Sequence, residues 1–224
     1  MFGDSSFIVI VIVVLAGVFG ITMYVSKKRH ERAAEAAKSR GWTYHKRFDS
    51  LRREVVKDVR GGRSGNAFVG VFEGEFEGGR FYAGTAQWTE TTGSGDNQQT
   101  QTHHRPILTR AIPLDSPAMR LEKENFVTKI FNRDIKTEWE EFNKEWRVTG
   151  DDPRFVSSVL SPTMQQWLMR NPGYCFVLRP GWVSVYRPDS DRLDVEDVEG
   201  LLAVSAAFTG EILPFIWQDY GSRR

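Results

Sequence analysis

Residues 67–88, AFVGVFEGEFEGGRFYAGTAQW, decide the fold of this 224-residue chain, because they read as two strands on either side of one turn. The turn signal is the Glu-Gly-Gly at 77–79, since glycine-containing turns of this length typically join hairpin strands. Apolar and aromatic side chains typical of strands lie on both sides of the turn: Phe68, Phe72, Phe81, Tyr82 and Trp88. We therefore predict a β-hairpin within an antiparallel sheet.

Strand patterns continue on the carboxyl side of this hairpin. Residues 89–102 contain no apolar side chain, and we expect them to form a mobile excursion between strands. Strand-like patterning resumes at 105–114 and at 119–123. A second hairpin is predicted within 174–187, around a Pro-Gly turn.

Helix signals are concentrated in the last third of the chain. Asp152 precedes Pro153 as an N-cap residue precedes proline at the first helical position, and Ser161-Pro162 begins a further helical turn. Residues 194–216 carry apolar side chains at helical spacing, and Pro214 should kink or end that helix. Between Trp139 and Val148 the spacing fits a helix and a strand equally well. Strands followed by interleaved helices predict an antiparallel α+β domain.

The amino-terminal side of the hairpin is strongly basic. Residues 27–63 contain thirteen Lys and Arg against five Asp and Glu, a balance of +8, whereas residues 64–224 contain seventeen against twenty-three, a balance of −6. Residues 27–40 are rich in helix formers, and Gly41 stands where a C-terminal cap would end that helix. A basic segment of this kind favours contact with anionic lipid headgroups over nucleic-acid binding, because an apolar helix directly precedes it.

That apolar helix is predicted at 7–25, FIVIVIVVLAGVFGITMYV, a run without any charged residue. As a helix it is about 28 Å long, close to the hydrocarbon thickness of a bilayer. A cleaved signal peptide is the competing interpretation, but the first six residues lack Lys and Arg, and no small-x-small cleavage site follows the run. We expect a single-pass anchor that continues into the helix at 27–40.

The flanking charges orient this anchor. No Lys or Arg precedes the run, whereas Lys27, Lys28, Arg29 and Arg32 follow it, and these four are the predicted membrane-surface contacts. The positive-inside rule then places the N-terminus outside the cell membrane and the folded domain in the cytoplasm. The predicted organisation is an anchor at 1–26, a basic juxtamembrane helix and linker at 27–63, and a soluble α+β domain at 64–224. Ala16 and Gly20 form a small-xxx-small pair that favours a weak homodimer.

Few residues in the soluble part point to chemistry. His103 and His104 are adjacent, so in extended backbone they point to opposite sides, and we interpret them as an exposed pair at the end of a polar loop. The acidic residues within 189–199 do not match a calcium-binding loop and are explained by the helix that follows them. Cys175, the only cysteine, lies in an apolar strand and is predicted to be buried. No nucleotide-binding or nucleophile-elbow motif is present.

The order of several segments resembles a family of uncharacterised bacterial single-pass membrane proteins. These segments are RGWTYHKRFDSL at 40–51, FEGGRFYAG at 76–84, EFNKEWRVTGDDPRFVSSVLSPTMQQWL at 141–168 and FIWQDYG at 215–221. The resemblance covers nearly the whole chain after the N-terminal span. It implies membrane anchoring, and no catalytic residue is carried over from it.

Three hypotheses of function remain open, and the third is a lipid or headgroup sensor, which would require aromatic or basic side chains of the soluble domain to face the bilayer beside the anchor. The first is a membrane-anchored cytoplasmic interaction or scaffolding module without catalysis, which contacts the lipid bilayer and a protein partner and needs no metal or cofactor. The second is a membrane-tethered enzyme or small-ligand-binding domain, whose site is assembled from residues scattered along the sequence. A pocket with convergent polar groups, around His103, His104 or the acidic cluster, would favour the second hypothesis.

Overall fold

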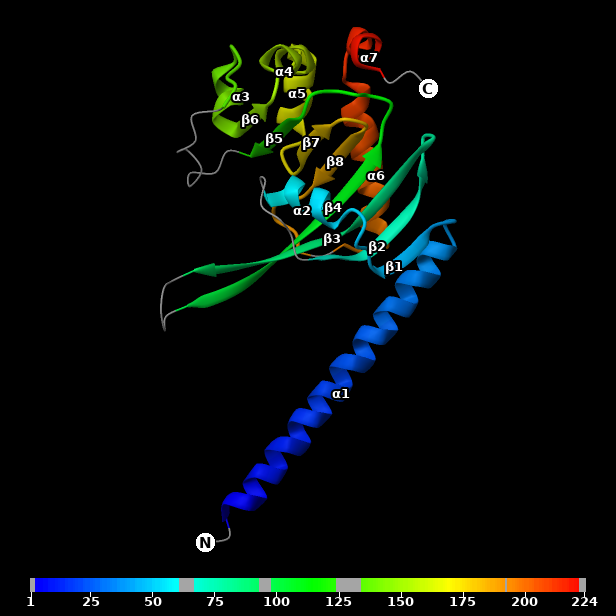
Figure 1. The fold of residues 1–224 in the computed structure, drawn as a ribbon, viewed down its shortest axis with the longest axis vertical. Coiled ribbons are helices and arrows are strands. Elements are labelled where there is room, and N and C mark those ends of the chain that lie inside the picture. Colours follow the sequence, from blue (N-terminus) through cyan, green and yellow to red (C-terminus); the bar gives the residue numbers. More distant parts are fainter. Residues whose placement is uncertain (1–2, 61–66, 93–97, 124–133, 192, 222–224) are drawn as a thin grey trace.

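The computed structural model contains one antiparallel sheet of eight strands in the order β1-β2-β3-β4-β8-β7-β5-β6 (Figure 1). The strands are β1 Thr43–Arg47, β2 Ala67–Phe76, β3 Gly79–Thr92, β4 Gln99–Ala111, β5 Met119–Lys123, β6 Trp146–Gly150, β7 Cys175–Arg179 and β8 Trp182–Tyr186. The helices are α1 Gly3–Lys38, α2 Arg52–Arg60, α3 Glu140–Glu145, α4 Pro153–Val159, α5 Pro162–Arg170, α6 Val195–Gly210 and α7 Pro214–Tyr220. The predicted antiparallel α+β class is confirmed.

The structure describes residues 3–60, 67–92, 98–123, 134–191 and 193–221. Side chains are described throughout these ranges except at 3–16, 18, 60 and 92. The structure therefore does not describe most side chains of the predicted membrane span at 7–25. β1 and α2 belong to the predicted segment 27–63, and both pack into the same sheet and core as the rest of the chain.

The hairpin predicted at residues 67–88 is present. β2 and β3 pair from Ala67 opposite Gln87 to Phe76 opposite Gly79. The turn between them holds Glu77 at φ 49° and Gly78 at φ 73°. Positive φ at both central positions is the type I′ geometry that matches the twist of hairpin strands. The β7–β8 hairpin is likewise confirmed, with Gly181 at φ 76° in its turn.

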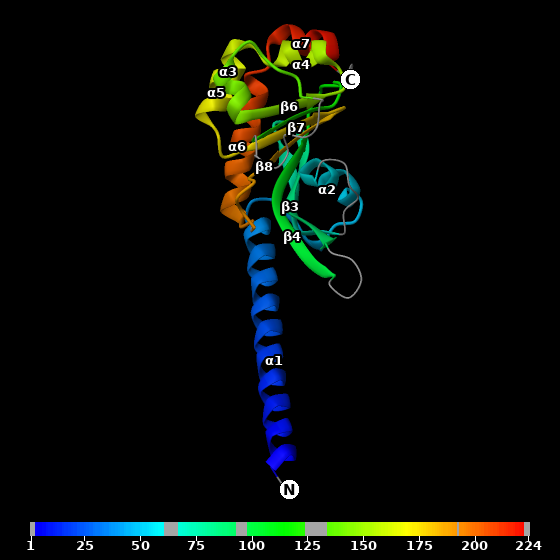
Figure 2. The same ribbon diagram turned by 90° about the vertical axis from the view of Figure 1, so that its left-hand side faces the viewer.

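Side chains alternate along the strands, so the two faces of the sheet are covered by different elements. In β7, Phe176 and Leu178 point to one face, whereas Cys175 and Val177 point to the other. We call the first the α6 face, because α6 covers it together with α3, α4, α5 and α7. The second is the α2 face, which α2 covers (Figure 2).

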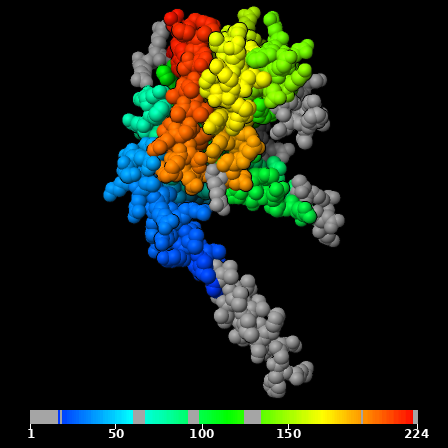
Figure 3. Space-filling model, turned by 180° about the vertical axis from the view of Figure 1, so that it is seen from behind, coloured from blue at the N-terminus to red at the C-terminus, as the bar shows by residue number. Residues whose placement is uncertain are grey.

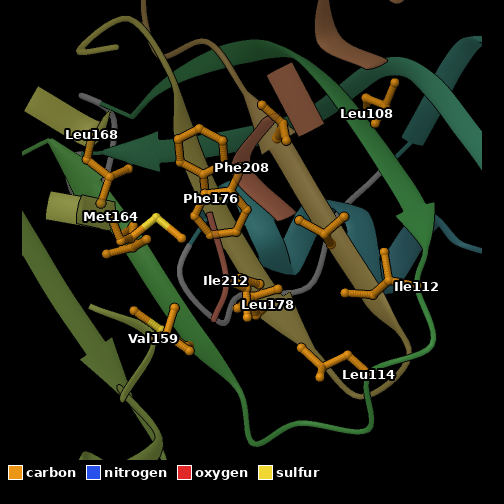
Figure 4. Packing of buried hydrophobic residues seen from close by; sticks show 14 of the residues in the cluster. Leu108, Ile112, Leu114, Val159, Met164, Leu168, Phe176, Leu178, Phe208 and Ile212 are labelled. Carbon is orange, nitrogen blue, oxygen red and sulfur yellow. The ribbon is translucent and has the colours of Figure 1, made fainter. Parts of the chain in front are cut away.

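The α6 face carries the larger core. Phe176 of β7 and Phe208 of α6 stack with ring centroids 4.3 Å apart, and Met164 and Leu168 of α5 lie beside them (Figure 4). All four side chains are buried. On the outside of this core, α5, α6 and α7 form a continuous surface (Figure 3).

The helix starts predicted in the last third are confirmed. The Asp152 carboxylate accepts the backbone N–H of Arg154 at 2.8 Å, and the Ser161 hydroxyl accepts that of Met164 at 3.2 Å. α6 ends at Gly210, and Pro214 begins α7 at 89° to it. Proline has no backbone N–H, but an N–H at the first helical position has no acceptor within the helix. Pro214 therefore loses no hydrogen bond by starting a helix after the break.

One other segment differs from the sequence interpretation, and the structure resolves a second segment that the sequence left ambiguous. The predicted excursion at 89–102 is wrong for the described residues, because 89–92 belong to β3 and pair with 99–102 of β4, while residues 93–97 lie outside the described ranges. The ambiguous segment around Trp146 contains both predicted structures, since α3 ends where β6 begins. In each case pairing with a neighbouring strand decides the outcome, and the local pattern does not contain that information.

α1 ends at the cap that the sequence predicts. Gly41, at φ 73°, donates its N–H to the Lys38 carbonyl at 3.1 Å, and Trp42 donates to the Ala37 carbonyl at 2.9 Å. These two bonds form a Schellman motif, which glycine favours because it adopts positive φ without steric cost. The motif turns the chain from α1 directly into β1.

Candidate functional site

The described part of α1 projects from the domain as an isolated rod (Figures 1 and 2). Its large apolar side chains are exposed by half or more: Phe19, Ile21, Met23, Tyr24 and Val25. The predicted surface-contact residues follow, and all four are exposed: Lys27, Lys28, Arg29 and Arg32. The predicted helix–helix contact involves Ala16 and Gly20. The structure does not describe the side chain of Ala16. Gly20 faces open space, because a Cβ atom built on it meets no atom within 4 Å.

Within the described residues, no single helix has both the length and the apolar composition required to cross a membrane. The bent pair α6 and α7 meets that requirement by length and composition only.

Polar contacts fix the carboxyl end of α1 to the domain. Arg40 pairs with Glu199 of α6, with 2.5 Å between Nε and Oε1. About three turns earlier, the His30 Nδ1 and the Tyr44 hydroxyl of β1 lie 2.6 Å apart. Ala37 is fully buried against the core. These contacts hold α1 at a defined angle to the sheet.

A large groove lies between α1 and the domain, and we call it the α1 groove. One wall is α1 itself at residues 24–36, and the opposite wall is formed by residues 191 and 193–196 around the start of α6. The floor is the part of the α6 face that the helices leave uncovered, formed by β1, β2, β3 and β4. The groove has a volume of about 1150 Å³. In Figure 3, α1 and the far end of β4 diverge beneath α6, where the groove opens.

Opposite charges line the two walls of the α1 groove. Lys28, Arg29 and Arg32 lie on the α1 wall, and Asp191, Asp194 and Glu196 on the α6 wall. All six side chains are exposed, and among the described residues no ion pair joins one wall to the other. The charges therefore face each other across open space.

The floor contributes polar groups from the sheet. His104, Gln87 and Thr85 are half-buried there, and Tyr44 closes the side nearest β1. Desolvation by burial raises the pKa of Tyr44, while the nearby Arg29 lowers it. The hydroxyl of Tyr44 is therefore a neutral hydrogen-bonding group at physiological pH.

The two histidines lie in β4 and not in a polar loop, so that part of the interpretation is wrong. His104 lines the α1 groove, whereas His103 stacks on Trp88 with ring centroids 5.2 Å apart. Both are half-buried. The prediction that they point to opposite sides is confirmed, because Trp88 belongs to the core of the α2 face.

A second group of polar residues is buried on the α2 face. The Asp58 carboxylate of α2 accepts the Ser184 hydroxyl at 2.6 Å and the Arg179 Nε at 3.1 Å. The hydroxyl of Thr109 lies 3.1 Å from that of Ser184 and accepts Arg179 Nη2 at 3.2 Å. We call these four residues the Asp58 cluster. None of them was identified from the sequence, because they come from α2, β4, β7 and β8.

Neighbouring groups extend this cluster along the α2 face. Arg120 donates to the backbone carbonyls of Asp58 and Lys57 at the end of α2, where a cation also complements the helix dipole. The Tyr186 hydroxyl donates to Glu122 at 2.6 Å, and burial raises the pKa of Tyr186 well above its usual value.

Cys175 lies buried on the same face, as predicted. Burial raises the pKa of its thiol to about 11. A neutral, buried thiol is a poor nucleophile, since the thiolate is the reactive form.

Among the residues that the structure describes, no group of three or more His, Cys, Asp or Glu side chains is arranged to hold a metal ion. Some of the acidic residues at the start of α6 instead form hydrogen bonds that cap this helix. The Asp197 carboxylate accepts the backbone N–H of Asp194 at 2.9 Å and pairs with Arg187 at 2.7 Å. This matches the sequence interpretation of these acids as helix-start residues.

The comparisons with known proteins give one structural match. The chain matches no protein-family model and no curated protein sequence. The crystal structure of the mycobacterial trehalose monomycolate transport factor A, TtfA, has a similar fold, with a TM-score of 0.60 and 12% sequence identity. The match covers 83% of this chain and 96% of that chain. At this identity the similarity establishes the fold alone.

Proposed function

We propose that this chain is a membrane-anchored interaction module on the cytoplasmic face of the cell membrane, which acts by binding a protein partner and not by catalysis. The anchor is the apolar run at 7–25, supported by the exposed apolar side chains of α1 and by the exposed cations directly after them. The orientation rests on the position of those cations. A homodimer through Ala16 and Gly20 is a further part of this proposal.

The observation that carries the proposal is a two-stranded arm at the far end of β3 and β4. Among the residues that the structure describes, the pairing of β2 with β3 reaches Gln87, and the pairing of β8 with β4 begins at Ile107. β3 and β4 remain paired with each other to Thr92 and Gln99, so they leave the sheet together and project from it (Figure 1). A ribbon of two strands is by itself only marginally stable in water. Binding of a partner along one edge would stabilise it.

The buried polar groups support a role without catalysis. Ser184, Asp58 and Arg179 are bonded to each other beneath α2. Cys175 is buried, and its raised pKa keeps the thiol protonated. A substrate would reach these groups only if α2 moved away from the sheet. The name of the structural neighbour describes a transport factor, and an accessory role of that general kind agrees with this proposal.

Photo-crosslinking in native membranes tests the proposal. A photoreactive amino acid is placed at Gln101, on the exposed face of the arm, and for comparison at Glu140, which is exposed on α3. The expected result is a recurrent protein adduct from position 101 and none from position 140. Equal labelling at both positions, or none at either, would count against the arm as a partner-binding element.

A second candidate function is ligand binding in the α1 groove. It is favoured by the convergence of His104 with the acidic residues Asp191, Asp194 and Glu196 on one cavity. The volume of the groove, about 1150 Å³, lies somewhat above the range of about 300 to 1,000 Å³ that is typical of small-molecule sites. Exposed charges on opposite walls indicate a ligand that itself carries both signs of charge.

A further inference from the structure

We propose that the α1 groove binds the headgroup of a zwitterionic phospholipid that carries a primary amine, the chemistry of phosphatidylethanolamine. The phosphate would lie against the α1 wall and the ammonium against the α6 wall. This inference rests on the proposed membrane anchor, because the groove then opens at the bilayer surface.

The position of the basic wall along α1 supports a lipid as the occupant. Val25 is the last residue of the apolar run, and together with Tyr24 it lies at the start of the groove lining. Lys28 and Arg29 follow it by three and four residues, which is a rise of about 4.5 to 6 Å along the helix. The headgroup layer is roughly 5 to 8 Å thick on each side of the hydrocarbon core. The two cations therefore lie at the level of the lipid phosphates.

The charges of the two walls select the class of headgroup. A phosphate close to Arg29 gains charge-assisted hydrogen bonds that neutral groups cannot supply. An anionic lipid without an amine would satisfy that wall but would leave Asp191 and Glu196 facing a second negative charge. A primary ammonium has three N–H donors for these carboxylates, whereas a quaternary ammonium has none. Phosphatidylethanolamine satisfies both walls at once.

The floor of the groove suits the remaining polar atoms of such a headgroup. Gln87, Thr85 and His104 present amide, hydroxyl and imidazole groups between the charged walls. The Tyr44 hydroxyl, which lies 2.6 Å from His30 Nδ1, adds another hydrogen-bonding oxygen beside the α1 wall. These groups are able to bond the ester and phosphate oxygens.

Native mass spectrometry of the full chain tests the inference. The protein is equilibrated in detergent micelles with an equimolar mixture of dioleoyl phosphatidylethanolamine, phosphatidylcholine and phosphatidylglycerol, and the retained lipids are counted. We expect phosphatidylethanolamine adducts in about tenfold excess over phosphatidylcholine adducts, the effect of one charge-assisted hydrogen bond. Equal retention of these two lipids would overturn the inference.

Two double variants separate the walls. Asp191→Asn with Glu196→Gln should reduce phosphatidylethanolamine retention to the phosphatidylcholine level and should not reduce phosphatidylglycerol retention, because the substitutions remove negative charge that faces an anionic headgroup. Lys28→Gln with Arg29→Gln should reduce retention of both phosphatidylethanolamine and phosphatidylglycerol. All four side chains are exposed, so the variants should fold, which circular dichroism checks.

A matched control removes two carboxylates outside the groove. Asp189→Asn with Glu140→Gln makes the same change in net charge and should leave phosphatidylethanolamine retention unchanged. If this control loses the lipid to the same extent as the groove variant, the effect is one of net charge and the proposed site is wrong. Equally tight binding of soluble glycerophosphoethanolamine would also overturn the assignment to a lipid.

The failure of this inference is distinguishable from the failure of the proposed function. Alkaline extraction of native membranes shows whether the chain is anchored. If the chain stays in the membrane and phosphatidylethanolamine is not preferred, the inference fails alone. If the chain is extracted, the anchor fails, and with it the premise of the lipid site.

Discussion

The two faces of the sheet are closed by different physical means. Five helices cover the α6 face, and aromatic side chains such as Phe176 and Phe208 stack between the layers. The α2 face is covered by the nine-residue α2, which contributes only Val55 and Val56 as fully buried apolar side chains. A helix this short buries little apolar area, so the Asp58 cluster and the Arg120 contacts hold it in place.

The α6 face therefore stabilises the domain by apolar packing, whereas the α2 face depends on hydrogen-bonded and ion-paired side chains that must all be present. Removing one buried ionic partner leaves the other without compensation. Removing an apolar side chain leaves a cavity whose cost depends on how far the surroundings collapse. Variants on the two faces should therefore differ in size and in how their effects combine.

The largest effect is expected on the α6 face. Phe208→Ala should lower the free energy of unfolding by about 4 kcal/mol, because it removes a fully buried ring stacked on Phe176. Urea unfolding of the full chain in detergent micelles measures the change. The control is Phe215→Ala, since that ring is 44% exposed, and it should cost roughly 0.5 kcal/mol or less. Similar losses in both variants would contradict the assignment of the main core to this face.

The next effect is expected on the α2 face. Asp58→Ala should lower the free energy of unfolding by about 3 kcal/mol, because it leaves Arg179 and Ser184 without their carboxylate partner. The same urea experiment measures it, with the exposed Asp49→Ala as control.

A double-mutant cycle sharpens this test. Combining Asp58→Ala with Arg179→Met should cost less than the sum of the two single variants, since each single variant already breaks the same pair. Additive losses would show that the Asp58 cluster does not act as a unit, and the contrast between the two faces would then disappear.

The smallest effect is a pH dependence on the α2 face. The pKa of Cys175 is raised from 9.0 to about 11 by burial, so as the pH rises the thiol ionises first in the unfolded chain. Its contribution to stability is complete below about pH 9 and is lost as the pH approaches 11. At pH 10 the loss amounts to about 1 kcal/mol.

Urea unfolding at pH 8 and pH 10 checks this prediction. The unaltered chain should lose about 1 kcal/mol more than the Cys175→Ala variant over that interval, because the variant retains Tyr186 and its own titration. Parallel losses in the two proteins would show that Cys175 is accessible to water, and that α2 does not seal its face of the sheet.

Local patterns accounted for much of the fold. The Glu77-Gly78 turn, the Asp152 and Ser161 caps and the Gly41 helix end were all readable, because each depends on a few adjacent residues. α2 was not predicted, since its apolar residues are few and its position depends on Asp58 bonds to distant strands. The arm at 89–102 was mistaken for an excursion, because its strand structure comes from pairing with a polar partner strand.

Much less of the candidate sites than of the fold could be predicted from the sequence. The basic residues Lys28 and Arg29 and the acidic residues Asp191 and Glu196 were both noticed, but as separate features of a lipid-facing helix and a helix start. The sequence contains no signal that they line one groove, since roughly 160 residues separate them and tertiary contacts such as the Arg40–Glu199 pair bring them together.

By itself, therefore, the sequence determined the class of the fold, the hairpins, the helix caps and the asymmetry of charge, because each arises from propensity or periodicity over short distances. The tertiary structure alone decided the covering of each face, the Asp58 cluster, the projecting arm and the α1 groove. These features depend on contacts between segments far apart in the chain, whose energies appear only once the sheet has brought the segments together.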